Sequence, residues 1–343
     1  MAGDERRETA GDESVPQKPA PETSPRNVVA VHAMTDSPVR IASMLASATE
    51  IVAALGLESQ LVAISHECDH PAHVLDRPRA SRPRFDPGGL DSGAIDRAVR
   101  KAMLEHGSVY AVDGELLARL RPTLVLTQAV CDVCAVPTAG VREVLRDHGI
   151  AADVLSLDAH TLEDILESVV LVGRAAGVPD RAAALADVLR ARLDRVREVV
   201  RDRPRPRVLA IEWLDPPFTP GHWVPAMVEL AGGRNLAGTA GGRSRETTWD
   251  ALADLDPDVL ILMPCGFGLD ASVRDADAHA RWLGDTASRA IREGRAFAVD
   301  GSALFNRSGP RVVDGVELLG ALLHPSCFPH FRADQARQWR LPS

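Results

Sequence analysis

TLEDILESVVLVGRAAGVPDRAAALADVLRARLDRVREVVRD, residues 161–202, is a long stretch of helical periodicity between two halves of similar pattern. Apolar residues recur at helical spacing from Leu162 to Val170, pause at Gly177-Val178-Pro179-Asp180, and then resume on one stripe. That stripe consists of Ala184, Leu185, Val188, Leu189, Leu193 and Val196. The acidic start at Asp180 and the basic end at Arg197 and Arg201 suit the helix macrodipole. The stretch predicts a helix that connects the two halves, with an ordinary surface helix as the alternative.

The break before Asp180 divides this stretch, so its first part belongs to the first half of the chain and its second part is the connecting helix. The expected organisation is a disordered tail over 1–38, a first α/β lobe over 39–178, the connecting helix over 179–204, a second α/β lobe over 205–335 and a tail over 336–343.

The composition is that of a soluble globular protein. The chain has 343 residues, of which 45% are hydrophobic and 25% are charged, enough for two compact lobes. The net charge of −9, without a basic patch, argues against a nucleic-acid partner. No apolar run of about 18 residues is present, so we expect no membrane span. Residues 1–38 lack the apolar core of a signal peptide, which predicts a cytoplasmic protein; an extracytoplasmic one is the alternative if the true start differs.

Each half alternates strands with helices, which predicts parallel α/β sheets. In the first half we expect strands over 40–44, 61–65, 109–112, 124–127 and 154–157, with a helix from Ala48 closed by Gly56 and helices over 94–105, 115–121 and 141–148. In the second half we expect strands over 207–212 and 259–263 and helices over 224–231 and 251–255. Residues 77–93 and 213–223 are expected to be loops.

One phrase occurs in both halves. ELLARLRPTLVL, residues 115–126, matches DALADLDPDVLI, residues 250–261, position by position. In each, an acid starts a helix, a proline separates the helix from a strand, and the strand leads into a loop that contains cysteine. Ligands of open α/β sheets bind beyond the carboxyl ends of the strands, so these loops are expected to face each other across a cleft.

Four segments carry a family resemblance: RIASMLASATEIVAALGLESQLVAISHECDHP, PTLVLTQAVCDVCAVP, PPFTPGHWVPAMVELAGGRN and LDPDVLILMPCGFG. They resemble the cobalamin-binding, BtuF-like members of the helical-backbone (TroA-like, class III) substrate-binding proteins of ABC transporters. The similarity runs from about Arg40 to Pro325.

The resemblance implies two Rossmann-like lobes joined by a rigid helix, little domain closure, and a cobalamin, related corrinoid or metal chelate bound in the cleft by a protein that is not an enzyme. The matching ligand-binding positions are Ser47, Ala48, Glu67, Gln128, Phe218, Trp249, Phe305 and Arg307. In transporter-linked members an acid on each lobe docks onto arginines of an ABC permease. Glu115 and Asp250 fall on those two positions.

The chain departs from the family in two respects: it shows no signal peptide or lipobox, and it has a single tyrosine. Aromatic contacts with a corrin ring must therefore come from other rings. These are Trp213, Phe218, Trp223, Trp249 and Phe305. His222 is a candidate lower axial ligand to cobalt or a donor to ligand amides. Arg307 suits a propionamide or phosphate, with a surface salt bridge as the alternative, and Glu50 suits helix capping or lobe packing.

The cysteines suggest a second hypothesis. The chain has five, an odd count that argues against a disulfide framework: Cys68, Cys131, Cys134, Cys265 and Cys327. The CxxC pair at Cys131 and Cys134 reads as a zinc half-site, a redox pair or two incidental thiols. If Cys68, Cys265 and His66 join it in the cleft, the set would suit zinc, an iron–sulfur cluster or cobalt. The alternative function is thus a thiolate metal- or Fe–S-binding protein, although no GxSxG, HExxH or Walker A motif indicates an enzyme.

Overall fold

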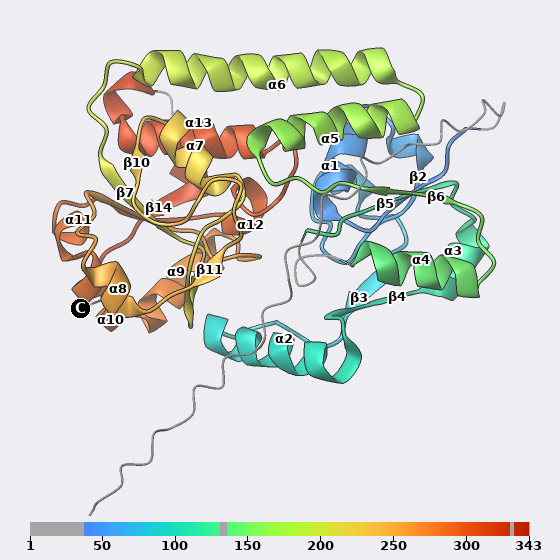
Figure 1. Cartoon of the computed structure of the whole chain (residues 1–343), viewed down its shortest axis with the longest axis horizontal. Coiled ribbons are helices and arrows are strands. Elements are labelled where there is room, and N and C mark those ends of the chain that lie inside the picture. The colour runs from blue at the N-terminus through green and yellow to red at the C-terminus, as the bar shows by residue number, and fades with distance from the viewer. Residues whose placement is uncertain (1–37, 131–135, 330–332, 343) are drawn as a thin grey trace, which may run out of the picture. The chain divides into compact units, whose positions relative to one another are not determined.

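The computed structural model describes residues 38–130, 136–329 and 333–342. These residues form two α/β lobes, and α5 (Leu162–Ala175) and α6 (Pro179–Val200) run along one side of them (Figure 1). Each lobe has its own sheet, which is parallel in the first lobe and mainly parallel in the second. The prediction of two Rossmann-like lobes joined by a long helix is confirmed.

The first lobe is built on a four-stranded parallel sheet in the order β2-β1-β5-β6. Its strands are β1 (Ile41–Ser43), β2 (Leu61–Ala63), β5 (Leu124–Thr127) and β6 (Asp153–Ser156). Its helices are α1 (Ala46–Ala54), α3 (Gly114–Leu120), α4 (Thr138–Asp147) and the 3₁₀ turns η1 (Glu58–Gln60) and η2 (Ala72–Val74). All residues of β1 and β5 are buried, as expected for central strands covered on both faces.

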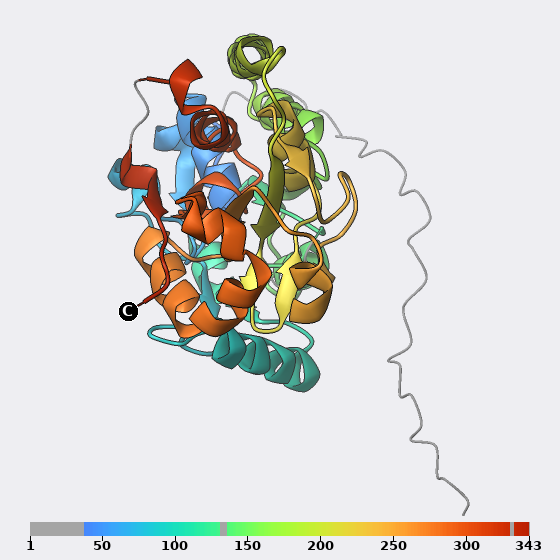
Figure 2. The same cartoon turned by 90° about the vertical axis from the view of Figure 1, so that its left-hand side faces the viewer.

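A small ribbon projects from the first lobe. β3 (Ser81–Pro83) pairs antiparallel with β4 (Tyr110–Val112), and α2 (Ser92–His106) lies between them in sequence. The sequence predicted α2 and β4, but β3 lies within a segment expected to be a loop. In both views α2 lies on the side of the lobes opposite α6 (Figure 1 and Figure 2).

The second lobe has a five-stranded sheet in the order β10-β7-β12-β13-β14, in which only β14 is antiparallel to its neighbour. Its strands are β7 (Arg207–Ile211), β10 (Arg234–Asn235), β12 (Val259–Leu262), β13 (Ala296–Val299) and β14 (Ala336–Gln338). Its helices are α7 (Val224–Leu230), α8 (Trp249–Ala253), α9 (Leu269–Ala278), α10 (Ala280–Thr286), α11 (Ser288–Arg292), α12 (Gly301–Leu304), α13 (Val312–Leu323) and the 3₁₀ turns η3 (Pro325–Cys327) and η4 (Ala333–Gln335).

Two parts of the second lobe differ from the sequence prediction. The expected loop over 213–223 contains a hairpin of β8 (Trp213–Leu214) and β9 (Pro217–Thr219), to which β11 (Arg245–Glu246) adds a third strand. The expected tail over 336–343 begins with β14, and the next residue, Trp339, is 2% exposed. Pairing with β13 and burial of the indole explain why this segment is ordered.

The repeated phrase produces the same local structure in both lobes. α3 leads into β5, and α8 leads into β12, and each of these strands lies beside the first strand of its own sheet. The residue before the proline has a left-handed backbone in both copies, with φ of 45° at Arg121 and 37° at Asp256. The two copies therefore encode the same sharp helix-to-strand connection.

α6 is attached to both lobes. It packs so closely on α5 that a Cβ on Gly173 would lie 2.1 Å from the Cβ of Ala182. Near its start, Nη1 of Arg181 donates to the carbonyl of Leu55 in the first lobe at 2.5 Å. Farther along, Nη2 of Arg192 lies 2.6 Å from carboxylate oxygens of both Asp314 and Glu317 on α13. α6 therefore contacts both lobes, which supports the expected role of a rigid connection.

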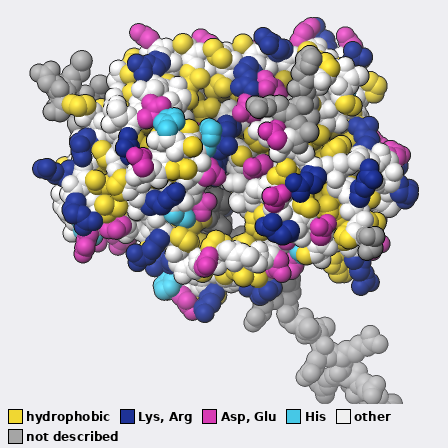
Figure 3. Space-filling view, turned by 180° about the vertical axis from the view of Figure 1, so that it is seen from behind, with side chains coloured by type: hydrophobic (Ala, Val, Ile, Leu, Met, Phe, Trp, Pro, Cys, Tyr) yellow, Lys and Arg dark blue, Asp and Glu magenta, His cyan; other side chains and the backbone are white. Residues whose placement is uncertain are grey.

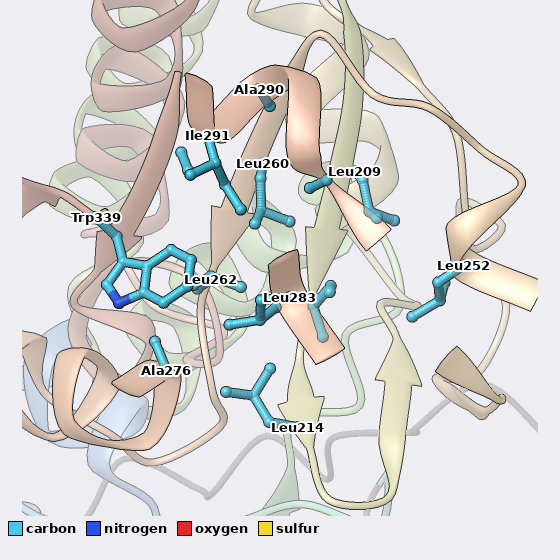
Figure 4. Close-up of a cluster of buried hydrophobic side chains, with 13 residues drawn as sticks. Leu209, Leu214, Leu252, Leu260, Leu262, Ala276, Leu283, Ala290, Ile291 and Trp339 are labelled. Carbon is cyan, nitrogen blue, oxygen red and sulfur yellow. The ribbon is translucent and has the colours of Figure 1, made fainter. Parts of the chain in front are cut away.

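Each lobe has its own apolar core. In the second lobe, Leu209 and Leu260 of the sheet belong to one buried cluster with Ile291 and Trp339 (Figure 4). The indole Nε1 of Trp339 donates to Oδ1 of Asp277 at 2.8 Å, so burial leaves it hydrogen-bonded. The core of the first lobe consists of Ala42, Met44, Ala63, Ala80, Leu117, Val125, Val136, Val141 and Leu145.

Candidate functional site

The surface is hollowed where the two lobes meet, with side chains of both charges on either side (Figure 3). A pocket of about 270 Å³ lies at this junction. The first lobe lines it with Glu50, Ala53, Ala54, Glu58, His70, Pro71 and His73, and the second lobe with Pro310 and Arg311. Residues from both lobes thus line the same pocket, as expected for a cleft between them.

Glu50 joins the lobes through arginines of the second lobe. Its side chain, on α1, is only 3% exposed. Arg311, which precedes α13, donates from Nε to Oε2 of Glu50 at 3.0 Å and from Nη2 to Oε1 at 2.6 Å. This two-pronged geometry is the strong form of an arginine–carboxylate pair. Of the two roles suggested by the sequence for Glu50, the structure places it in lobe packing.

Arg307 completes this charged cluster. Its side chain is 10% exposed and pairs with both oxygens of Asp69, with Nη2 to Oδ2 at 2.8 Å, and with Oε1 of Glu50 at 3.4 Å. Nη2 also donates to the carbonyl of Glu67 at 3.2 Å and to Oγ of Ser302 at 3.1 Å. Burial alone would lower the pKa of Arg307, but its carboxylate partners raise it. Arg307 is therefore engaged in contacts between the lobes.

The pKa of Asp69 reflects the same pairing. Burial on its own would raise this pKa, but the hydrogen bonds and charge of Arg307, together with the charge of Arg311, lower it overall. Asp69 therefore remains ionised in the folded protein at neutral pH.

Ser47 and Ala48 also lie at the junction, and both are buried. Oγ of Ser47 is 3.3 Å from Oγ of Ser308 in the second lobe. Gln128, at the end of β5, is 7% exposed and accepts a hydrogen bond through its carbonyl from Thr138. The lobes thus touch directly at Ser47, one of the positions that the resemblance assigned to ligand binding.

His66 and Glu67 follow β2 and form a polar pair at its carboxyl end. Nε2 of His66 lies 3.1 Å from Oε1 of Glu67, and Nδ1 lies 2.8 Å from Oγ of Ser81. The hydrogen bond from His66 lowers the pKa of Glu67 and outweighs burial, which would raise it. Because the Glu67 side chain is 43% exposed, its carboxylate is accessible to a ligand.

His222 lies on the second lobe opposite His160 of the first. Its backbone is left-handed, with φ of 51°, and is held by hydrogen bonds with Gly241 and Gly242. The ring centroids of His222 and His160 are 5.5 Å apart. Nδ1 of His222 is buried and has no hydrogen-bond partner among the described residues. Burial, reinforced by the charges of His160 and Arg243, lowers the pKa of His222, so the ring is neutral at neutral pH.

The aromatic residues divide into structural and accessible groups. Phe305 is fully buried, and its carbonyl accepts a 2.7 Å hydrogen bond from the buried indole of Trp223. The Phe305 ring is thus buried in this structure, and its contact with a ligand stays a prediction. Phe218 and Trp249 are half-buried, and Trp249 packs against the core of the second lobe.

Trp213, one of the rings expected to contact a corrin, forms an aromatic pair with Phe267, which the sequence did not indicate. Trp213, at the start of β8, meets Phe267 edge to face with centroids 5.3 Å apart. Both rings are half-buried and follow the carboxyl ends of β7 and β12. Their positions just beyond two parallel strands were the available sequence signal.

The expected thiolate site does not form among the described residues. Cys68 is 2% exposed, and its Sγ lies 3.1 Å from Oγ1 of Thr49 beneath α1. Burial raises the pKa of this thiol, which keeps it protonated. Cys265 is half-buried after β12, and Cys131 and Cys134 lie outside the described residues. In the described part of the chain no three or more His, Cys, Asp or Glu side chains, His66 included, are grouped to hold a metal ion.

The two acids assigned to permease docking occupy equivalent sites. Glu115 is in the first turn of α3 and Asp250 in the first turn of α8, and both are exposed. Asp113 and Thr248 cap these helices through hydrogen bonds to the backbone. No helix among residues 38–130, 136–329 and 333–342 is long and apolar enough to cross a membrane.

Comparison with known proteins agrees with this architecture. The chain is 24% identical over 297 residues to the uncharacterized ABC transporter substrate-binding lipoprotein YvrC of Bacillus subtilis strain 168, which covers 85% of this chain and 82% of that protein. It is similar in structure to a periplasmic heme binding protein from Pseudomonas aeruginosa, with 25% identity, a TM-score of 0.64, and coverage of 84% of this chain and 94% of that chain.

Another similar solved structure is the periplasmic vitamin B12 binding protein BtuF of Vibrio cholerae, with 21% identity, a TM-score of 0.60, and coverage of 84% of this chain and 97% of that one. At that identity the likeness bears on the fold. The model of the periplasmic binding protein family matches residues 41–300. The match covers more than half of the chain and agrees with its two-lobed fold, so this chain belongs to the periplasmic binding protein family.

Proposed function

We propose that this protein binds cobalamin, or a related corrinoid or metal chelate, between its two lobes and passes it to an ABC permease. Its role is binding rather than catalysis. The proposal is supported by family membership and by similar solved structures described as binding heme and vitamin B12.

The observation that carries the proposal is the state of His222. A neutral imidazole with an unpartnered, buried Nδ1 can donate a lone pair to a metal centre. It lies on a loop held in place by backbone hydrogen bonds and faces His160 of the other lobe. A chelated cobalt or iron held between the lobes suits such a ligand.

The other accessible side chains suit a large flat ligand. Trp213 and Phe267 offer ring surface from the second lobe, as do Phe218 and the exposed part of Trp249. From the first lobe, Glu67 offers an ionised carboxylate that can accept hydrogen bonds from amide groups. Corrinoids combine an apolar ring with peripheral amides, so they match both surfaces.

Absorption titration tests this function. The purified protein is titrated with aquocobalamin, cyanocobalamin and hemin, and His222→Ala and His148→Ala are compared, since His148 is an exposed residue at the end of α4. We expect saturable binding, a spectral change for a ligand with an exchangeable axial position, and loss of that change only in His222→Ala. Absence of uptake of all three compounds would contradict the proposal.

Transfer to a permease is tested separately. We expect the wild-type protein to capture an ABC permease from detergent-solubilised membranes, and the double variant Glu115→Arg, Asp250→Arg to lose that capture while it still binds the ligand. Equal capture by both proteins would exclude these acids as the docking residues.

The two locations considered from the sequence make different predictions for cell fractionation. A partner in a transporter requires the protein on the outer side of the membrane, as the name of the lipoprotein YvrC suggests for that relative. A cytoplasmic fraction would instead support a binding role without import.

A further inference from the structure

α2 makes a second connection between the lobes. It belongs to the β3–β4 ribbon of the first lobe and lies on the side opposite α6 (Figure 1 and Figure 2). It reaches the second lobe at three elements: its N-terminal end meets α9 and the β8–β9 hairpin, and its middle meets β11. The cleft between the lobes is thus spanned on one side by α6 and on the other by α2.

The contact with α9 is buried. The backbone N–H of Ser92 donates to Oδ1 of Asp275 at 3.1 Å, and the Ser92 hydroxyl donates to the same atom at 3.0 Å. Ser92 is fully buried and the Asp275 side chain is 1% exposed. A carboxylate at the N-terminus of a helix is favoured by the helix dipole. This contact joins residues 183 positions apart in the chain.

The contact with the hairpin places a glycine of α2 against an aspartate side chain. A Cβ on Gly93 would lie 2.1 Å from Oδ2 of Asp215, in the turn between β8 and β9. The close approach is to the carboxylate of Asp215, an exposed side chain that would have to rotate aside if position 93 carried a Cβ. Farther along α2, Nη2 of Arg100 lies 3.0 Å from Oε2 of Glu246 on β11, but both of these side chains are more than half exposed. Exposed pairs of this kind contribute little.

The buried contact is incompletely satisfied. Oδ2 of Asp275 is buried without a hydrogen-bond partner among the described residues, and Nδ1 of His279 lies 3.6 Å from Oδ1. A buried polar atom without a partner lowers the cost of separating the surfaces, because water can hydrogen-bond to it after separation. The junction at Glu50, by contrast, is held by two arginines and by α6. Separation of the lobes is therefore easier on the α2 side.

We propose that α2 is a strap that closes the cleft, and that a ligand reaches or leaves the site when the N-terminal end of α2 separates from Asp275 and the β8–β9 hairpin. Asp275 is a positioning residue for this strap. The inference rests on the proposed function for the presence of a ligand, but the opening of α2 can be measured without one.

Hydrogen–deuterium exchange of the ligand-free protein tests the strap. We compare the wild type with Asp275→Ala, Ser92→Ala and the control Arg100→Ala, which breaks only the exposed pair. Loss of both hydrogen bonds to Asp275 should speed amide exchange in α2 at least about tenfold, whereas Arg100→Ala should change it less than about threefold. Exchange in α6 and in β7 should stay as in the wild type. Ser92→Ala removes one of the two bonds and keeps the test available if Asp275→Ala does not fold.

Ligand kinetics provide the second readout. The ligand used is whichever of aquocobalamin and hemin binds the wild type. In Asp275→Ala, the rate constants for association and dissociation of this ligand should both rise about fivefold or more, with a smaller change in Kd. Unchanged α2 exchange in both Asp275→Ala and Ser92→Ala would overturn the strap, even if ligand binds. Faster α2 exchange without uptake of any ligand would support the strap and contradict the proposed function.

Discussion

Replacing Glu50 by Gln tests whether the charged junction holds the lobes together. The substitution keeps the size of the side chain but removes the charge that Arg311 contacts at 2.6 and 3.0 Å and Arg307 at 3.4 Å. In the variant, Arg307 retains its close ion pair with Asp69, whereas the remaining carboxylate near Arg311 is Asp69, at 3.7 Å. Breaking a buried ion pair costs about 3–5 kcal/mol. Because Arg311 is 21% exposed and can regain water, we expect about 2–4 kcal/mol here.

The assay is thermal and urea unfolding of the wild type and variants. At about 2–4 °C per kcal/mol, a loss of this size should lower the Tm by roughly 4–16 °C. The control is Arg190→Ala, which breaks a 2.6 Å pair with Glu163 on the surface, where the partners are 43% and 67% exposed. That control should cost less than about 1 kcal/mol. If Glu50→Gln and Arg190→Ala lower the free energy of unfolding by amounts that differ by less than about 0.5 kcal/mol, the charged junction does not hold the lobes together.

Three further predictions concern other residues. The pKa of Asp69 is lowered in the folded protein, so the ionised side chain stabilises the fold fully above the unfolded pKa of about 3.9. This stabilisation is lost as the pH falls through the folded pKa. In urea unfolding at several pH values, the stability advantage of wild type over Asp69→Asn should therefore shrink below about pH 4. Gly93→Ala should change the free energy of unfolding by less than about 1 kcal/mol, because the exposed Asp215 side chain can rotate away from the added Cβ and the better helix propensity of alanine offsets the remaining cost. A loss of more than about 2 kcal/mol in thermal unfolding would show that Asp215 cannot move. Cys68 should be alkylated by iodoacetamide at least about tenfold more slowly than Cys265 in native protein, by peptide mass spectrometry, because its thiol is buried and its pKa is raised; equal rates would show that it is accessible.

The two-lobed fold could be predicted because its signals are local and repeated. The alternation of strands and helices, and the phrase shared by residues 115–126 and 250–261, need no knowledge of distant contacts. The left-handed residues Arg121 and Asp256 occupy matching places in that phrase, so even the connection between helix and strand follows from local sequence.

Other elements depend on partners far away in the chain. β8 and β9 are two and three residues long, too short for a periodic signal, and β9 is completed by β11 some 26 residues later. β14 lies beyond the last predicted strand and is ordered by β13. The neighbouring Trp339 is an isolated aromatic residue in the sequence, and its burial depends on core residues of the second lobe that are far away in the chain.

The site shows the same limit. The pairs of Glu50 with Arg307 and Arg311 span more than 250 residues, so sequence could suggest lobe packing for Glu50 without naming its partners. The resemblance placed Phe305 on the ligand side of the cleft, but whether a side chain points outward or inward depends on the packing of α12 and α13, and here it points inward. Trp213 and Phe267, by contrast, are half-buried, and both follow central strands of the second sheet.

The continuity of α6 constrains how this protein can change over time. Its 22 residues span about 33 Å, and each residue turns the helix by about 100°. One inserted residue within α6 would therefore advance the second lobe by about 1.5 Å and rotate it by about 100°, which would carry Arg311 away from Glu50. Surface loops can gain or lose residues freely, but the length of α6 sets the distance and the relative rotation of the two lobes. Variation in this protein should accumulate as substitutions in α6 and as insertions elsewhere.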